Sequence, residues 1–336
     1  MENIDLSKVA DLRELDKIRI VDGRGFTRFL FGFTLNMFFL NGHDADKRLR
    51  GVEIVERYRH LLGKEITHYL PNGATRLKKM DDKAFIHYKA AALIKVKNNY
   101  GFAASVYGFP NGKESDTPTP YCAAFITSSE NPLNPWYSRF DLYFPVSFVV
   151  EKGYAAFVGI VKEWCAHFRP DRGSSGFSVI FDDSKTSGGW GAYAFPFVKR
   201  FPGLDWDAST HWDALSNPYL GPKRGVADTK RTIRSINWLS IIDDDFLTEL
   251  GGLDKVKTNL GPQCPVLSYK GGAILQAGPH PELGDLNDGI ISAYYRTVAR
   301  VLKPLRFEGY NKVELLDAPA PLNDLEETLK WIRRFD

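Results

Sequence analysis

The chain has 336 residues, of which 43 % are hydrophobic and 25 % are charged. This composition excludes a disordered chain and a small disulfide-stapled module, and the length allows either one large domain or two of ordinary size. The 44 basic and 41 acidic residues give a net charge of +3, which provides little long-range attraction to nucleic acid.

Cysteine usage and hydropathy indicate a cytoplasmic protein. Cys122, Cys165 and Cys264 are far apart and form no CxxC or Cys/His pattern, which argues against a disulfide framework or a zinc knuckle. The first residues carry acids and lack the layout of a signal peptide. The most hydrophobic segment, residues 29–40, is shorter than the roughly 20 residues that a membrane span requires. We therefore expect no membrane contact.

The first half of the chain predicts a strand, two helices, an antiparallel meander and a further helix. Residues 26–39 are rich in phenylalanine and leucine, which favours a buried strand over a short helix. Apolar side chains in residues 44–62 recur at steps of three and four, as in a helix. The other predicted elements are a helix at 81–97, strands at 100–109, 121–127 and 137–145, and a helix at 147–168.

The second half predicts a looser version of the same pattern. A long irregular region occupies residues 201–234, and Gly251 and Gly252 separate two short helices in the position of a helix C-cap. The predicted elements are a strand at 176–181, a helix at 189–200 interrupted near Pro196, a strand at 237–242, helices at 243–250 and 253–260, a hairpin of 265–269 with 273–277, a helix at 289–302, a strand at 312–315 and a helix at 323–334.

This order of elements predicts an α+β fold, with mainly antiparallel sheet flanked by helices. The repeated pattern divides the chain into an N-terminal α/β half at residues 1–170 and a C-terminal α/β half at residues 171–336. Two interpretations stay open, namely two related halves packed together and one continuous domain.

The glycine-rich and proline-rich stretch AGPHPELGDLNDG, residues 277–289, joins the hairpin to the next helix. Asp285, Asn287 and Asp288 lie where a helix start favours side-chain acceptors and negative charge, so capping explains them. The alternative is a metal or acid/base site of His280, Glu282, Asp285 and Asp288. Capping is favoured, because such a site needs ligands from elsewhere in the chain.

The other candidate motifs have a structural explanation beside the chemical one. His43, Asp44 and Asp46 offer metal ligands, but their order is also that of a turn and a helix N-cap. The triplet Asp243, Asp244 and Asp245 stands between a strand and a helix, where acids stabilise the first turn. The sequence contains no Walker loop, GxGxxG, HExxH or EF-hand, and RGSSGFS lacks the spacing of a nucleophile elbow. We predict a protein that is not an enzyme and that uses no cofactor or metal.

One local basic segment and several aromatic side chains are further candidates for binding. Lys223, Arg224, Lys230, Arg231 and Arg234 could contact nucleic acid, although a solvated linker is favoured. The aromatic side chains could anchor a partner, although burial in the core is favoured. They are Trp190, Tyr193, Trp206 and Trp212.

The order of segments in the C-terminal half resembles that of a known family. INWLSII, FLTELGGLDKVKTNL, GGAILQAGPHPELGDLND and YYRTVARVLKPLRF follow one another there. Upstream, FDLYFPVSF and FPGLDW are also similar. The chain resembles the bacterial type VI secretion immunity family that is paired with VRR-Nuc and related restriction-endonuclease-like nuclease effectors. The resemblance covers residues 26–307 and is most specific in residues 236–307.

The resemblance implies an antitoxin-like cytoplasmic protein that binds a cognate nuclease effector. It would neutralise the effector by covering its active site or by blocking productive toxin assembly, without contacting nucleic acid directly. Because such inhibitors often present an acidic face to a basic nuclease cleft, the predicted interface is the acidic set. That set is Asp243, Asp244, Asp245, Glu282, Asp285 and Asp288.

Two alternatives from other functional classes stay open at this point. One is a metal-dependent hydrolase that uses His43, Asp44 and His280. The other is a nucleic-acid-binding module that uses the basic segment from Lys223 to Arg234. The sequence gives neither the oligomeric state nor the identity of the effector.

Overall fold

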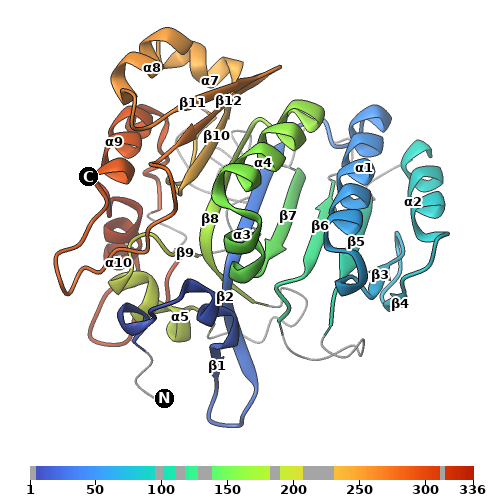
Figure 1. The fold of residues 1–336 in the computed structure, drawn as a ribbon, viewed down its shortest axis with the longest axis horizontal. Helices are drawn as coiled ribbons and strands as arrows, with labels where there is room; N and C mark the ends of the chain where they lie inside the picture. The colour runs from blue at the N-terminus through green and yellow to red at the C-terminus, as the bar shows by residue number, and fades with distance from the viewer. Residues whose placement is uncertain are drawn as a thin grey trace.

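The described part of the chain contains one twelve-stranded sheet (Figure 1). The computed structural model describes residues 5–94, 101–109, 118–127, 138–181, 190–206, 231–310 and 315–336. The strand order is β11-β12-β10-β8-β2-β7-β6-β5-β3-β4, and in addition β1 pairs with β2 and β9 with β8. Every pairing between these strands is antiparallel except that of β8 with β9. The predicted α+β fold is confirmed.

The two longest strands lie at the centre of the sheet and pair with each other. The strands are β1 (Arg19–Val21), β2 (Thr27–Phe39), β3 (His68–Leu70), β4 (Lys78–Lys79), β5 (Ala103–Tyr107), β6 (Cys122–Ile126), β7 (Ser138–Phe144), β8 (Arg172–Ile180), β9 (Asp205–Trp206), β10 (Leu239–Asp243), β11 (Val266–Tyr269) and β12 (Gly272–Gln276).

Helices cover the sheet unevenly. Figure 1 shows α1, α3 and α4 in front of the central strands, α2 beside β3 and β4 at one end, and α7 to α10 gathered at the other end. The helices are α1 (Ala45–Leu62), α2 (Ala84–Leu93), α3 (Val146–Lys152), α4 (Tyr154–Phe168), α5 (Trp190–Arg200), α7 (Asp244–Glu249), α8 (Leu253–Leu260), α9 (Ala293–Leu302) and α10 (Asp324–Ile332).

Strand β2 is the centre of the hydrophobic core. Every residue from Phe29 to Phe39 is buried, because the strand is covered on both faces. Side chains alternate between faces, so Phe33 contacts Phe157 of α4 at 5.9 Å between ring centroids. On the opposite face, Leu30 packs in a second cluster with Cys122, Tyr143 and Ile180. The mostly apolar sequence of β2 fits this double burial, and Thr34 and Asn36 are polar residues that are buried within it.

Helix α1 lies close against the sheet because it carries a glycine where it meets the sheet. A side chain at Gly51 would place its Cβ atom 2.2 Å from the ring of Phe125 on β6. Tyr58 of the same helix donates a hydrogen bond from its hydroxyl to the carbonyl of Tyr143 at 2.5 Å. The contact of α1 with β6 therefore requires a residue without a side chain at position 51.

Several predicted elements differ from the observed ones. The helix predicted at 147–168 is two helices, α3 and α4, because Gly153 adopts a positive φ of 85° between them. Helix α5 continues through Pro196, where an interruption was predicted. Helix α9 begins at Ala293, four residues after the predicted start. The short strands β1, β3, β4 and β9 were not predicted, and residues 312–314 of the predicted strand at 312–315 lie outside the described residues.

The sheet is continuous across the predicted division at residue 170. Strand β8 from the second half pairs with β2 from the first half, with Leu30 opposite Ile180 and Phe38 opposite Arg172. The division into two α/β halves stays a prediction. In the described ranges, no helix is long and apolar enough to cross a membrane.

Candidate functional site

The first group of predicted interface acids stands at the start of α7. The Asp243 carboxylate caps this helix by accepting a hydrogen bond from the backbone N–H of Phe246 at 3.0 Å. Arg231 forms ion pairs with Asp243 and, at 2.9 Å, with Asp245. Asp244 is exposed. Helix capping and pairing with Arg231 therefore account for Asp243, and Asp244 presents its carboxylate to solvent.

The second group lies on the loop of residues 278–291, hereafter the 278–291 loop. The Asp285 carboxylate is almost completely buried and accepts hydrogen bonds from the Arg200 guanidinium at 2.7 and 3.0 Å. These hydrogen bonds from Arg200 lower the pKa of Asp285. Asp285 also accepts from the backbone N–H of Asn287 at 2.9 Å. Its role is to fix the loop to α5.

The backbone closes the end of this loop. Asp285 and Ile290 exchange two backbone hydrogen bonds of 2.8 Å, and the N–H of Leu286 donates to the carbonyl of Arg200 at 2.8 Å. Gly284 has a φ of +66°, and a Cβ atom there would lie 2.7 Å from the Ile290 carbonyl oxygen. The path of the loop is therefore fixed by hydrogen bonds and by a position that favours glycine.

The closed end of the loop presents two apolar side chains and one acid to solvent. Leu286 is 39 % exposed and Ile290 is 57 % exposed, and Asp288 between them is also exposed. We call these three residues the loop tip. A fixed loop with exposed apolar and charged side chains is typical of protein contact sites, because little ordering entropy is lost on binding.

The structure separates the two acidic groups. Asp243 stands opposite Gly272 at the start of β12, whereas Leu239 stands opposite Gln276 at its end, just before the 278–291 loop. Five residues of extended strand span about 13 Å between their first and last Cα atoms. The six predicted acids therefore form two surfaces at opposite ends of β10 and β12.

The residues proposed for a metal-dependent hydrolase are not brought together. Asp44 caps α1 by accepting from the backbone N–H of Asp46 at 2.9 Å. His43 follows the end of β2, which lies at the Asp243 end of β10, and His280 follows β12 at the other end. No group of three or more His, Cys, Asp or Glu side chains among the described residues is placed to hold a metal ion.

The basic segment is described only in part. Lys223, Arg224 and Lys230 lie outside the described residues. Arg231 is paired with the acids of α7, and Arg234 is paired with buried Asp205 at 2.6 Å. The two described arginines therefore hold the fold together.

The aromatic candidates are likewise described in part. Trp206 is buried and stacks on Phe181 at 5.2 Å between ring centroids, as the core interpretation predicts. Tyr193 is partly buried beneath the guanidinium of Arg28. The side chain of Trp190 and the whole of Trp212 lie outside the described residues.

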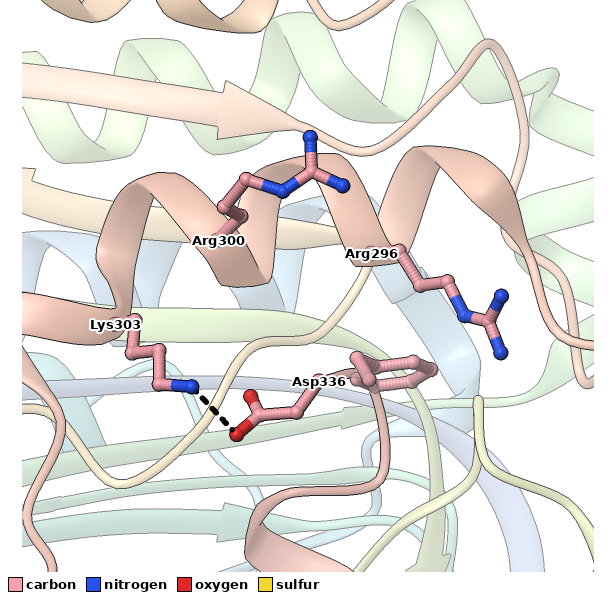
Figure 2. A pocket seen from close by; sticks show the side chains of 5 residues that line it. Arg296, Arg300, Lys303 and Asp336 are labelled. Carbon is pink, nitrogen blue, oxygen red and sulfur yellow. Dashed lines mark ion pairs between the residues drawn. The ribbon is translucent and has the colours of Figure 1, made fainter.

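A hollow beside α9 is the feature that the sequence did not indicate as a site. It has a volume of about 330 Å³ and is lined by Arg296, Arg300, Lys303, Phe335 and Asp336 (Figure 2). The sequence places these cations on the polar face of a helix, which predicts exposure but does not distinguish a binding surface from an ordinary solvated one. The feature of the sequence that could have indicated this surface is the recurrence of these cations at steps of three and four residues, which places them on one helix face.

The charges of this hollow differ in their pairing. Asp336 accepts hydrogen bonds from Arg306 at 2.6 and 2.9 Å and forms an ion pair with Lys303 at 3.1 Å. The hydrogen bonds from Arg306 and Lys303 lower the pKa of Asp336 to about 2. Arg296 and Arg300 are exposed, and within the described ranges neither forms an ion pair. Figure 2 shows both extending away from Asp336 in different directions.

Comparison with known proteins identifies the class of molecule. The model of the TsiV family, described as type VI immunity for VRR-NUC, matches residues 50–335. The chain therefore belongs to this family of type VI secretion immunity proteins, and the resemblance in its C-terminal half is confirmed. No curated protein sequence matches the chain significantly.

A solved structure shares the fold. The Pseudomonas aeruginosa T6SS protein PA0821 superposes with a TM-score of 0.73 and 17 % sequence identity, over 95 % of this chain and 87 % of that one. At this identity the similarity concerns the fold, which extends through nearly the whole chain.

Proposed function

We propose that this chain is a cytoplasmic immunity protein that binds a cognate VRR-NUC effector and blocks its nuclease activity, without being an enzyme itself. The observation that carries the proposal is the family match, which spans residues 50–335. The effector is a protein partner, so the interaction requires a stable surface of about 800 Å² or more on each side.

The loop tip is the contact surface that we favour. A nuclease that binds the phosphate backbone needs a basic cleft, and an acidic, partly apolar projection is complementary to such a cleft. Leu286 and Ile290 would supply apolar contact, and Asp288 would supply the charge. Glu282, on the same loop, is partly buried and could add a second acid at the edge.

The predicted acids then divide by role. Asp285 positions the loop through Arg200, and Asp243 and Asp245 are engaged by Arg231. Asp244 belongs to the separate surface at the start of α7 and would contact the effector only if the complex reached that end of the sheet. We therefore assign Asp288 and Glu282 to the contact and Asp285 to its support.

The test is co-expression of the effector with variants of this chain, followed by counting survivors and by co-purification. The wild-type chain should rescue growth and purify with the effector. Ile290→Lys, which removes an apolar contact and places a cation against the basic cleft, should weaken binding at least about tenfold. Ile86→Lys on α2 is the matched control, because Ile86 is 65 % exposed and lies at the far end of the sheet.

The outcomes distinguish the immunity function from the assignment of the loop tip as its contact surface. Failure of the wild-type chain to bind or rescue would contradict the immunity function itself. Equal rescue by Ile290→Lys and Ile86→Lys would leave the immunity function supported and would remove the loop tip from the interface.

A further inference from the structure

Most of the described arginines in the C-terminal half pair with carboxylates. Arg200 pairs with Asp285 at 2.7 Å, Arg234 with Asp205 at 2.6 Å and Arg306 with Asp336 at 2.6 Å. Arg296 and Arg300, together with Lys303, form what we call the α9 basic face. Among the described residues, its two arginines have no acidic partner.

Helix stability does not account for this arrangement. Arg296 and Arg300 are four residues apart, where like charges destabilise a helix. Arg300 and Lys303 stand near the C-terminal end of α9, where the helix dipole favours cations. Arg296 is only three residues from the first helical residue, where the dipole disfavours a cation. Its side chain is therefore better explained by an interaction outside the chain.

The directions of the side chains favour a large ligand over a small anion. A free phosphate or carboxylate is held by donors that converge on it, whereas Arg296 and Arg300 diverge in Figure 2. Two separate guanidinium groups fit carboxylates that are spaced along a protein surface. Each planar guanidinium can bind one carboxylate through two parallel hydrogen bonds.

The acids beside the α9 basic face favour a protein over a nucleic acid as its ligand. Asp336 lines the same hollow, and Arg306 bridges it to Glu308 at 2.7 Å. Both carboxylates would repel a continuous row of phosphates, and Lys303 is already neutralised in part by Asp336. A protein surface can place its acids opposite Arg296 and Arg300 and a cation opposite Glu308.

We propose that the α9 basic face is a second docking surface of the immunity protein, which receives an acidic segment of the effector. This inference rests on the proposed function, because it takes the effector as the partner. An acidic loop tip and a basic α9 face together would fix the orientation of the complex, since charges of opposite sign on one interface suppress alternative registers.

The experiment compares two double variants that change net charge equally. Arg296→Glu with Arg300→Glu reverses the α9 basic face, and Lys78→Glu with Lys79→Glu reverses two exposed lysines of β4 at the far end of the sheet. Association and dissociation rates with purified effector are measured at low and high salt. Melting temperatures establish that both variants are folded.

We expect the α9 variant to bind the effector about tenfold or more weakly, chiefly through slower association, and to lose most of the salt dependence of the wild-type rate. The β4 variant should stay within about twofold of wild type. Equal affinities of the two variants would overturn the docking proposal while leaving the immunity function intact. No binding by the wild-type chain would contradict the immunity function and, with it, this surface.

The same measurement with duplex DNA tests whether a nucleic acid, the alternative polyanion, binds the α9 basic face. We expect the wild-type chain to show no salt-dependent DNA binding that the α9 variant lacks. DNA binding by the wild-type chain that is lost in the α9 variant would assign the face to nucleic acid and overturn the proposal.

Discussion

The arginines near α10 and those on α9 have opposite roles. The first are held by hydrogen bonds within the protein, and the second extend into solvent. Arg334 is partly buried and donates to the carbonyls of Pro202 and Trp331 at 2.6 and 2.9 Å, and burial lowers its pKa to about 10. Arg234 lies nearby, paired with Asp205. Arg296 and Arg300 stand in solvent without an acidic partner in the described chain.

The difference shows how to separate supporting charges from charges available to a partner. A buried charge requires its hydrogen-bond partners, because leaving it uncompensated costs several kcal/mol. An exposed arginine costs the fold little, whether or not it is paired. Substitutions should therefore destabilise the protein in the order of burial, and the exposed positions should affect binding alone.

The largest effect is expected at Asp205. Asp205→Ala leaves Arg234, whose side chain is only 10 % exposed, without its carboxylate, and also removes the acceptor for the backbone N–H of Trp206. Urea denaturation should show a loss of about 3–5 kcal/mol in the free energy of unfolding. Asp244→Ala, at an exposed position, is the control. A loss below about 1 kcal/mol for Asp205→Ala would show that this buried ion pair supports the fold no more than an exposed charge does.

An intermediate effect is expected at Asp285. Asp285→Ala removes the hydrogen bonds to Arg200 and to the backbone N–H of Asn287, and should destabilise the protein on the order of 1–2 kcal/mol. Hydrogen exchange of the amides of residues 286–290 should increase more than that of amides in β2. Unchanged exchange in the loop would show that Asp285 does not hold it.

The pair of Asp336 with Arg306 should appear in the pH dependence of stability. The folded pKa of Asp336, about 2, lies below its ordinary value of 3.8. The pair therefore stabilises the protein at neutral pH, and this contribution is lost as the pH falls from about 5 towards 2. Asp336→Asn should remove this part of the acid sensitivity, on the order of 1 kcal/mol after solvent screening. The same acid profile in both proteins would exclude the pair as a stabilising contact.

The smallest effect on stability is expected on the α9 basic face. Arg296→Gln and Arg300→Gln should each change the free energy of unfolding by less than about 0.5 kcal/mol, because both side chains are exposed. The same variants should weaken effector binding. A loss of more than about 1 kcal/mol in the free energy of unfolding, measured by urea denaturation, would instead show that these arginines stabilise the fold.

The sequence predicted those helices and strands that are determined by residues within one short segment. Helix α8 has the predicted bounds because its apolar positions and its flanking glycines are all within one short segment. The hairpin of β11 and β12 was predicted because Lys270, Gly271 and Gly272 form a short glycine-containing turn between two apolar runs. Strands of two or three residues, such as β4 and β9, contain too few positions to show alternation.

The candidate site depends on contacts that are distant in sequence. Asp285 was grouped with the interface acids, because its pairing with Arg200, 85 residues away, leaves no trace in the local pattern. The exposure of Leu286 and Ile290 follows from the same pairing, since it sets which side of the loop faces solvent. The sequence places Arg296 and Arg300 on the polar face of a helix, but that neither forms an ion pair among the described residues depends on the packing of the C-terminal residues against α9.

The most direct test of the immunity function is a titration of the purified chain into a DNA-cleavage assay of the cognate VRR-NUC effector. The account predicts that cleavage falls in proportion to the added chain and reaches zero near saturation, and that Ile290→Lys needs a concentration about tenfold or more higher for the same inhibition. Undiminished cleavage with the wild-type chain in large excess would contradict it.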